Sequence, residues 1–294
     1  MDGIIIIDKP MGYTSQDTVS KVKRILNVKK AGHTGTLDPM ATGVLPVMLG
    51  NSTKLSKYLV EHDKTYISKI KLGEKTDTGD CEGKIILTKN VDCSVLTKER
   101  IEQILNSFLG KQKQIPPMYS SIKINGKKLY EYARNGEKID VPERDIEIYN
   151  IKLINIDLKK LEIEFEVSCS KGTYIRSLCE DIARKLDTIG YMSYLKRTMV
   201  SNFKIEDAVN FEQLESKKND IDFLNEKIFS MEELFRNYPK IHLNERKEKL
   251  FLNGVLLTFD LKEGIYNIYN SDNNYLGLGI IINNLLKRDI IIDE

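Results

Sequence analysis

The sequence predicts a mixed α/β protein that carries a small β-rich unit at its C-terminus. Three observations support this prediction. Short apolar runs at residues 3–8 and 44–49 are typical of buried strands. Residues 173–186 place apolar side chains at i, i+3, i+4, i+7, i+8 and i+11, which is the spacing of an amphipathic helix. Beyond the Tyr-Pro pair at residues 238–239, apolar and polar residues alternate as they do in half-buried strands.

The other elements follow in order along the chain. Thr14 and Asp17 have capping-box-like spacing, which predicts a helix over residues 15–27 with Val19 and Val22 on its apolar face. The remaining expected elements are strands over 65–72, 83–87, 146–157, 161–168, 265–269 and 275–282, and helices over 97–108 and 244–252.

Composition limits the class of protein. The chain has 294 residues, 41% of them hydrophobic and 30% charged, and this is typical of a globular protein with one large domain, or with a domain and a smaller unit. The sequence has neither a long apolar run nor a signal peptide, so we expect a cytoplasmic protein that does not bind membranes. Four cysteines without CxxC spacing and three separated histidines argue against a metal site.

One run of sequence stands out chemically. Residues 32–47 read GHTGTLDPMATGVLPV and combine His33, Asp38, three threonine hydroxyls and three glycines. Taken alone, Asp38-Pro39 fits a helix N-cap followed by proline at the first helical position. The whole run is harder to explain as a cap. So many glycines are typical of a loop whose backbone approaches a ligand closely.

This run and four others resemble the TruB family of tRNA pseudouridine synthases. The others read DKPMGYTS at 8–15, KTY at 64–66 with LGEKTDTGD at 72–80, PPMYSS at 116–121, and KGTYIRS at 171–177. They occur in the family's order across residues 1–200. The resemblance implies a pseudouridine-synthase fold, in which a mostly antiparallel sheet with flanking helices forms the floor of the site.

The resemblance also implies a reaction. Converting uridine to pseudouridine breaks the N-glycosidic bond, rotates the uracil and rejoins it to the sugar through carbon. No redox change or external group is needed, so we expect no cofactor and no metal. A carboxylate nucleophile is needed, and Asp38 occupies the family's catalytic position. The attack could be on the sugar C1′ or on the base C6, and the sequence does not choose between them.

Arg176 and Tyr66 are the other two expected catalytic residues. Arg176 lies in the first turn of the helix predicted over 173–186, where the helix dipole disfavours a cation, so it should have an anionic partner. Spacing slightly favours Glu180, four residues on, whereas the resemblance implies Asp38, which the arginine would orient and keep ionised. A strand tyrosine such as Tyr66 is usually a packing residue. The resemblance implies instead that Tyr66 stacks on the flipped uracil and that its hydroxyl assists proton transfer.

Further residues acquire roles from the resemblance. Lys9 and Pro10, otherwise an ordinary strand-to-turn junction, would support the active-site loop. His33 would bind RNA by inserting into the T-loop, and Leu195 would pack near the active site. Residues 198–201 read TMVS where many family members have TRSG, which removes one expected arginine contact.

Residues 110–145 predict an RNA-binding insertion. They interleave three tyrosines with lysines and arginines, a composition typical of surfaces that follow a nucleic-acid backbone and stack on bases. An ordinary charged surface segment that does not bind RNA would have a similar composition. The resemblance implies an insertion that grips tRNA, with Lys127 and Lys128 among its contacts. The cations of this segment include Lys111, Lys113, Lys123, Lys127, Lys128, Arg134 and Lys138.

The combined hypothesis is an enzyme that isomerises uridine 55 in the T-loop of tRNA. Residues 1–239 would form the catalytic domain, and residues 240–294 would form a small PUA-like RNA-binding module. We expect a monomer that binds the T-arm without a guide RNA. An RNA-guided relative acting on ribosomal RNA is the alternative enzyme, but that branch usually has longer termini. A non-catalytic RNA-binding or RNA-folding protein is the third possibility, and the catalytic residues retained here argue against it.

Overall fold

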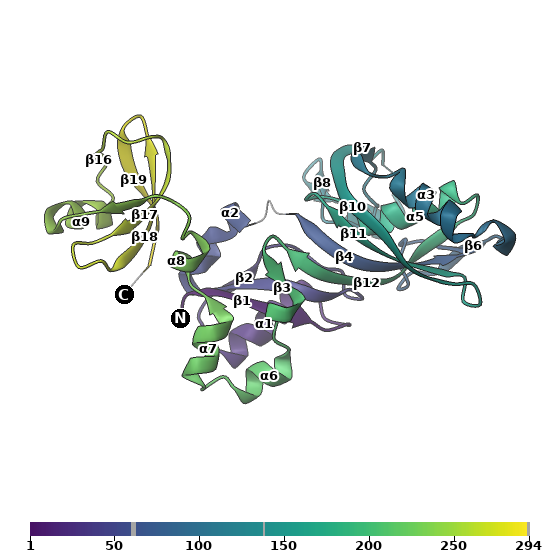
Figure 1. Ribbon diagram of the computed structural model, residues 1–294, viewed down its shortest axis with the longest axis horizontal. Helices are drawn as coiled ribbons and strands as arrows, with labels where there is room; N and C mark the ends of the chain where they lie inside the picture. Colours follow the sequence, from purple (N-terminus) through teal and green to yellow (C-terminus); the bar gives the residue numbers. More distant parts are fainter. Residues whose placement is uncertain (60–62, 138, 293–294) are drawn as a thin grey trace.

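A ten-stranded sheet forms the body of the protein. The computed structural model describes residues 1–59, 63–137 and 139–292 (Figure 1). The continuous path of the sheet is β14 (Ile228–Phe229), β1 (Gly3–Lys9), β3 (Thr42–Leu49), β12 (Gly190–Val200), β4 (Lys64–Leu72), β11 (Glu162–Cys169), β10 (Arg144–Asp157) and β7 (Gly110–Gln114). Two strands pair off this path, β2 (Ala31–His33) with β3 and β13 (Phe203–Lys204) with β12.

The sheet is mostly antiparallel, as predicted. Among the described strands of this sheet, the one parallel ladder is the short contact of β12 with β3, where Lys196 faces Thr42 and Arg197 faces Gly43. This contact joins the two halves of the sheet. One half holds β1, β2 and β3, and the other holds β4, β7, β10 and β11, with β12 between them.

Helices cover the sheet and fill the connections. They are α1 (Ser15–Ile25), α2 (Ser56–Leu59), α3 (Lys98–Asn106), α4 (Leu129–Arg134), α5 (Ile175–Lys185), α6 (Phe211–Ser216), α7 (Ile221–Lys227), α8 (Met231–Leu234) and α9 (Glu245–Leu252). Short 3-10 segments occupy Gly50–Leu55, Cys93–Val95 and Ile205–Asp207. Two small hairpins are β5 (Glu74–Thr76) with β6 (Ile85–Thr88), and β8 (Lys123–Ile124) with β9 (Lys127–Lys128).

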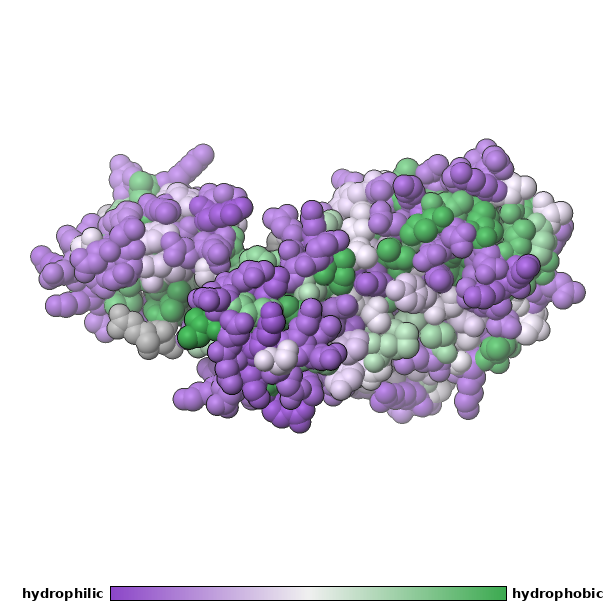
Figure 2. Space-filling model, turned by 60° about the horizontal axis from the view of Figure 1, so that its bottom comes forward, coloured by the Kyte–Doolittle hydropathy of each residue, from purple (hydrophilic) through white to green (hydrophobic). Residues whose placement is uncertain are grey.

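Each half of the sheet has its own apolar core. Helix α5 buries one face against β4, β11 and β12, and Leu178 and Ile182 on that face are fully buried. Helix α1 packs Val19 and Val22 against β1 and β3. Thr14 accepts a hydrogen bond from the backbone N–H of Asp17 at its start, which is the predicted capping interaction. By contrast, α6 and α7 present a largely hydrophilic surface (Figure 2).

A second sheet lies at the C-terminus. Its five strands are β15 (Lys240–His242), β17 (Gly264–Tyr269), β18 (Tyr275–Ile282), β19 (Leu285–Ile291) and β16 (Leu257–Thr258), in that spatial order. Phe251 of α9 and Ile268, Ile281 and Leu286 of the sheet are fully buried in a core of their own. This curled sheet confirms the predicted β-rich C-terminal unit.

The C-terminal sheet also shares a core with the body of the protein. Leu278 and Ile290 belong to the same apolar cluster as Ile4 and Ile6 of β1. The carboxylate of Asp289 binds the side chains of two body residues, Lys57 and Tyr58. The C-terminal sheet is therefore packed against the body by buried apolar contacts and by a charged contact.

Several elements differ from the prediction, and the largest omission is β12. Its buried side chains do not alternate, because register shifts fall between Met192 and Tyr194 and again between Arg197 and Met199. Strand β7 reads GKQKQ and lacks an apolar signal. The helix expected over 15–27 ends at Ile25, because Asn27 adopts a φ of +50° that an α-helix does not allow.

The shared core generates a stability prediction. Ile290→Ala should lower the free energy of unfolding of the protein by about 2–5 kcal/mol, because it opens a cavity between the two sheets. Ile282→Ala is the matched control, since Ile282 lies in the same sheet but is 54% exposed, and it should change stability by less than about 0.5 kcal/mol. Urea unfolding curves for the two variants and the wild type measure the difference. Equal midpoints for the two variants would contradict the shared core.

Candidate active site

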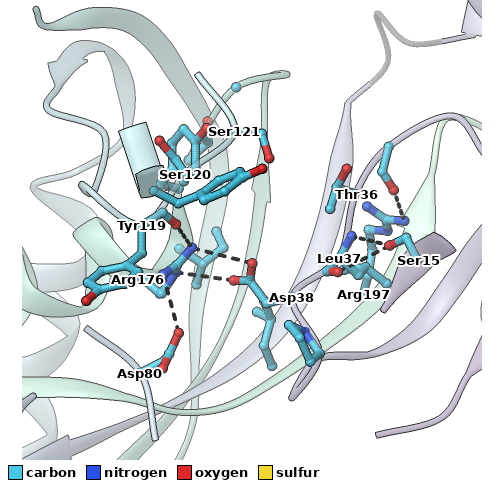
Figure 3. A pocket seen from close by; sticks show the side chains of 18 of the residues that line it. Ser15, Thr36, Leu37, Asp38, Asp80, Tyr119, Ser120, Ser121, Arg176 and Arg197 are labelled. Atoms are coloured by element: carbon cyan, nitrogen blue, oxygen red, sulfur yellow. Dashed lines mark hydrogen bonds and ion pairs between the residues drawn. The ribbon is translucent and has the colours of Figure 1, made fainter. Parts of the chain in front are cut away.

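A large cleft lies where the two halves of the sheet meet. Its volume is about 1060 Å³, and Asp38, Tyr66, Arg176 and Leu195 are among the residues that line it. Asp38 comes from the loop between β2 and β3, Tyr66 from β4, Arg176 from the first turn of α5, and Leu195 from β12. Figure 3 shows the carboxylate of Asp38 pointing toward the guanidinium of Arg176.

The loop that carries Asp38 is not a helix start. Asp38 and Pro39 lie in a turn, in which the N–H of Ala41 donates to the carbonyl of Asp38 at 3.0 Å. The helix N-cap interpretation of this pair is therefore wrong. The buried hydroxyl of Ser15 holds the loop at the preceding residue: it accepts a hydrogen bond from the N–H of Leu37 at 2.8 Å and donates to its carbonyl at 3.2 Å.

A buried lysine also supports this loop. Lys9 ends β1, and its side chain is inaccessible to solvent. Its ammonium group donates to the carbonyls of Pro10, Tyr13 and Pro39, the last at 3.2 Å. Burial lowers the pKa of Lys9 to about 8. The structure thus places a cation directly beneath the residue that follows Asp38.

Arg176 is the best connected side chain of the cleft. Its Nε and Nη2 atoms lie 3.2 and 3.4 Å from the two carboxylate oxygens of Asp38. Nη1 lies 3.3 Å from the carboxylate of Asp80 and donates to the carbonyl of Thr78 at 3.1 Å. Nη2 donates to the carbonyl of Tyr119 at 2.8 Å. Each of the three nitrogens of the guanidinium therefore has a polar partner, through three hydrogen bonds and through ion pairs with Asp38 and Asp80.

The local alternative partner of Arg176 is wrong. Glu180 instead pairs with Lys75 of β5, at 3.4 Å. The anionic partners of Arg176 are Asp38 and a residue that the sequence analysis did not single out, Asp80, whose side chain is almost fully buried. Asp80 ends the LGEKTDTGD run, and that run was the only signal in the sequence that could have identified it.

Burial and the neighbouring positive charges act in opposite directions on the pKa of Asp38. Burial raises the pKa of Asp38 above its ordinary value and is the largest effect, and the negative charge of Asp80 adds to it. Arg176 and Lys9 lower this pKa but do not cancel the increase. The ion pair therefore orients the carboxylate and offsets only part of the cost of burying its charge.

Tyr66 lies in the floor of the cleft beside a buried arginine. Tyr66 is 7% exposed, and it faces Arg197 of the adjacent strand β12. The guanidinium of Arg197 makes a hydrogen bond to Tyr66 and donates to the carbonyls of Val44 and Gly35 at 2.8 and 3.1 Å. Burial raises the pKa of Tyr66 to about 12, although Arg197 opposes the increase. The phenol is therefore neutral at neutral pH.

Arg197 was not predicted as a site residue. The sequence feature that could have identified Arg197 is Gly43, which lies opposite it on β3. Gly43 has a φ of +100°, and a Cβ atom there would lie 2.2 Å from the carbonyl oxygen of Arg197. Any larger residue would separate the two strands at the point where the sheet halves meet.

The expected RNA-binding residues are only partly brought together. His33 is partly buried at the edge of the cleft, and burial and the charge of Arg197 both lower its pKa. Lys128 lines the cleft with its ammonium group 5.3 Å from the ring centroid of Tyr130. Lys127 lies outside the described lining and pairs with Glu137 at 3.1 Å.

Other cations extend the edge of the cleft. The lining includes two lysines, Lys64 and Lys171, and two arginines, Arg134 and Arg144. Lys138 lies outside the described residues. In the part of the chain that the structure describes, no three His, Cys, Asp or Glu side chains are grouped as metal ligands would be. The described helices are too short or too polar to cross a membrane.

Comparison with known families gives two matches. Residues 23–175 match the N-terminal domain of the TruB family of pseudouridylate synthases, and residues 176–236 match the C-terminal domain of tRNA pseudouridylate synthase B. A Clostridium kluyveri protein named tRNA pseudouridine synthase B is 42% identical over 286 residues, which cover 95% of this chain and 96% of that protein. A Francisella philomiragia protein of the same name is 41% identical over 303 residues, which cover 100% and 98%.

Solved structures share the fold. An H/ACA ribonucleoprotein bound to a substrate RNA containing 2′-deoxyuridine has a TM-score of 0.70 at 24% identity, covering 99% of this chain and 85% of that chain. An archaeal box H/ACA Nop10–Cbf5 complex has a TM-score of 0.66 at 25% identity, with the same coverage. The predicted fold class is confirmed.

The hydroxyl that holds the Asp38 loop generates a second prediction. Ser15→Ala should lower the free energy of unfolding by about 1–3 kcal/mol, because the buried N–H of Leu37 loses its acceptor. Ser20→Ala is the matched control, since Ser20 is an exposed serine of the same helix. Urea unfolding of both variants measures the effect. If the Ser15 variant is as stable as the control, the hydroxyl does not anchor the loop.

Proposed function

The chain belongs to the TruB family of pseudouridylate synthases, and we propose that it converts uridine 55 in the T-loop of tRNA to pseudouridine. One observation carries the proposal. Asp38, at the family's catalytic position, stands in a cleft with its carboxylate held at both oxygens by Arg176. About a third of the Asp38 side chain remains exposed, so a substrate can reach a carboxylate whose direction is fixed.

Asp38 acts as the nucleophile in this proposal. Its carboxylate forms a transient bond to C1′ of the ribose or to C6 of the uracil. The N1–C1′ bond breaks, the base rotates, C5 forms a new bond to C1′, and the bond to Asp38 breaks. A proton then leaves C5 and one is gained at N1, so the product is an isomer of the substrate. Arg176 directs the carboxylate, and the buried Asp80 fixes Arg176 from its other side.

Tyr66 and Arg197 act on the base. A uridine of a folded tRNA must leave its stack to enter the cleft, and an aromatic ring can replace the lost stacking with about 1–3 kcal/mol per base. Tyr66 presents such a ring, and its neutral hydroxyl can pass a proton during the isomerisation. The hydrogen bond from Arg197 fixes the ring in place. Leu195, which is 6% exposed in the same cleft, contributes apolar contact to the base.

The edge of the cleft binds the T-arm. Lys128, Arg134, Arg144 and Lys171 supply positive charge for backbone phosphates, and His33 lies where it can hold the flipped nucleotide out of its loop. Lys127, which precedes Lys128 on β9, contributes once RNA replaces Glu137 as its partner. Lys9 and Pro10 hold the Asp38 loop from below.

We assign residues 1–239 to catalysis and residues 240–294 to a PUA-like RNA-binding module. The enzyme acts as a cytoplasmic monomer without a guide RNA. The named relatives are 41–42% identical over nearly their whole length, whereas the ribonucleoprotein structures are 24–25% identical. This difference favours the stand-alone tRNA enzyme over the RNA-guided relative.

The test of function uses the purified protein and an unmodified tRNA transcript, without guide RNA. We expect pseudouridine at position 55 from the wild type and none from Asp38→Asn, because an amide cannot act as the nucleophile. A transcript with cytidine at position 55 is the substrate control. Binding of tRNA by the Asp38→Asn variant should persist. Product from that variant within about tenfold of the wild-type rate would contradict the assignment, since a nucleophile contributes several orders of magnitude.

The raised pKa of Asp38 predicts a pH dependence. The nucleophile must be ionised, so the single-turnover rate should fall as the pH decreases through this pKa. Because burial raises the pKa, the decrease should begin above the range of an ordinary aspartate, whose pKa is about 3.9. Rates at each pH measure the inflection, with melting curves to confirm that the enzyme is folded. An inflection at or below the ordinary value would show that the ion pair outweighs burial.

A further inference from the structure

We propose that Gln114 is a positioning residue for the isomerisation: it fixes the start of α5 and, through it, the guanidinium of Arg176. The inference rests on the proposed function, because it concerns how precisely Arg176 orients Asp38. Gln114 is the last residue of β7 and is 5% exposed. It is not among the described residues that line the cleft, so it acts on the reaction through another residue.

The side chain of Gln114 pairs with one residue at both of its backbone groups. Its Oε1 accepts a hydrogen bond from the N–H of Tyr174 at 2.8 Å, and its Nε2 donates to the carbonyl of Tyr174 at 3.0 Å. Tyr174 is the N-cap residue of α5 and, within the described chain, makes no side-chain capping bond of its own. A side-chain amide from strand β7 thus holds the helix start, which has no side-chain cap of its own.

The residues that follow Gln114 also contact the first turn of α5. The carbonyl of Ile115 accepts a hydrogen bond from the hydroxyl of Ser177 at 2.9 Å. The carbonyl of Tyr119 accepts the 2.8 Å bond from Nη2 of Arg176. Two prolines lie between these contacts and limit the motion of the segment, because proline fixes φ. Segment 114–119 therefore holds residues 174, 176 and 177 of the helix start.

The Arg176–Asp38 contacts are long, so a small shift of the helix start would weaken them. Charge-assisted N–H···O bonds are commonly about 2.7–2.9 Å long, whereas the two contacts here are 3.2 and 3.4 Å. A further displacement of a few tenths of an ångström would bring the longer one close to the limit of a hydrogen bond. The contact of Arg176 with Tyr119 is the shortest of its five, so the guanidinium would follow segment 114–119 away from Asp38.

The experiment compares Gln114→Ala with Gln112→Ala. Gln112 lies on the same strand and bonds the carbonyl of Phe108, whose ring lies against Lys185 at the opposite end of α5 from Arg176. We expect Gln114→Ala to slow the single-turnover rate roughly 10- to 100-fold, the effect of a small misplacement of a catalytic group. Apparent Kd for tRNA should stay close to that of the wild type. Gln112→Ala should match the wild type in both.

Two further measurements distinguish a loss of Arg176 positioning from a general loss of structure in the variant. In Gln114→Ala, the acid inflection of the rate should move to higher pH, because a loosened Arg176 lowers the pKa of Asp38 less while Asp80, Lys9 and Glu82 stay in place. In an Arg176→Lys background, Gln114→Ala should cause little further loss, since both changes remove the same orientation. A slow variant without the pH shift, or fully multiplicative losses, would overturn the inference.

A shape-conserving variant covers the case in which alanine prevents folding. Gln114→Glu keeps the acceptor for the N–H of Tyr174 and loses the donor to its carbonyl, so it should show the same changes. A folded Gln114→Glu enzyme with wild-type rate and inflection would overturn the inference. If the wild type itself forms no pseudouridine, the proposed function fails. If the wild type is active and the Gln114 variants match it, only the role of Gln114 fails.

Discussion

The active site depends on one buried guanidinium, that of Arg176, whose three nitrogens are held by ion pairs and hydrogen bonds. A charge removed from water is tolerated only when it is paired and its donors are satisfied. Arg176 meets this condition with acceptors from separate parts of the chain: the Asp38 loop, the turn at Thr78 and Asp80, and the carbonyl of Tyr119. None of these parts is near another in sequence. The cleft can therefore form only when both halves of the sheet and the insertion reach their final positions.

The same constraint explains the arrangement around Asp38. The guanidinium of Arg176 faces the carboxylates of Asp38 and Asp80, so the three groups together carry a net negative charge, and burial raises the pKa of Asp38. Lys9 offsets part of that charge from beneath the loop, and its own pKa falls to about 8 because it is buried. Ser15 holds the loop by its backbone rather than by charge. The carboxylate of Asp38 is thus oriented by Arg176. Its loop is held at Leu37 by Ser15 and at Pro39 by Lys9, and about a third of its side chain stays exposed.

The sequence predicted those parts of the molecule that are marked by a pattern of neighbouring residues. The helix carrying Arg176 and the strand carrying Tyr66 have regular periodicity, and the glycine-rich run marked Asp38. Strand β12 was missed because two bulges break its alternation. Arg197 was missed with it, since its importance comes from pairing with Tyr66 across strands. The partner of Arg176 could not be chosen by spacing, because Glu180 is closer in sequence while Asp38 is closer in space.

The C-terminal sheet begins where the sequence pattern changes, but it is not structurally independent of the body of the protein. The Tyr-Pro pair at 238–239 marks a change of pattern, yet the two sides of it are joined by buried groups. Asn267, which has no exposed surface, donates to the carbonyls of Phe235 and Tyr238, and Tyr269 donates to the carboxylate of Glu232 at 2.9 Å. Removing the C-terminal sheet would leave these groups and the apolar cluster of β1 exposed to water. A tRNA that contacts both the cleft and this sheet would meet two surfaces held at a fixed separation. The proposal that the C-terminal sheet binds RNA is therefore best tested with substitutions on its exposed face, which leave the shared core intact.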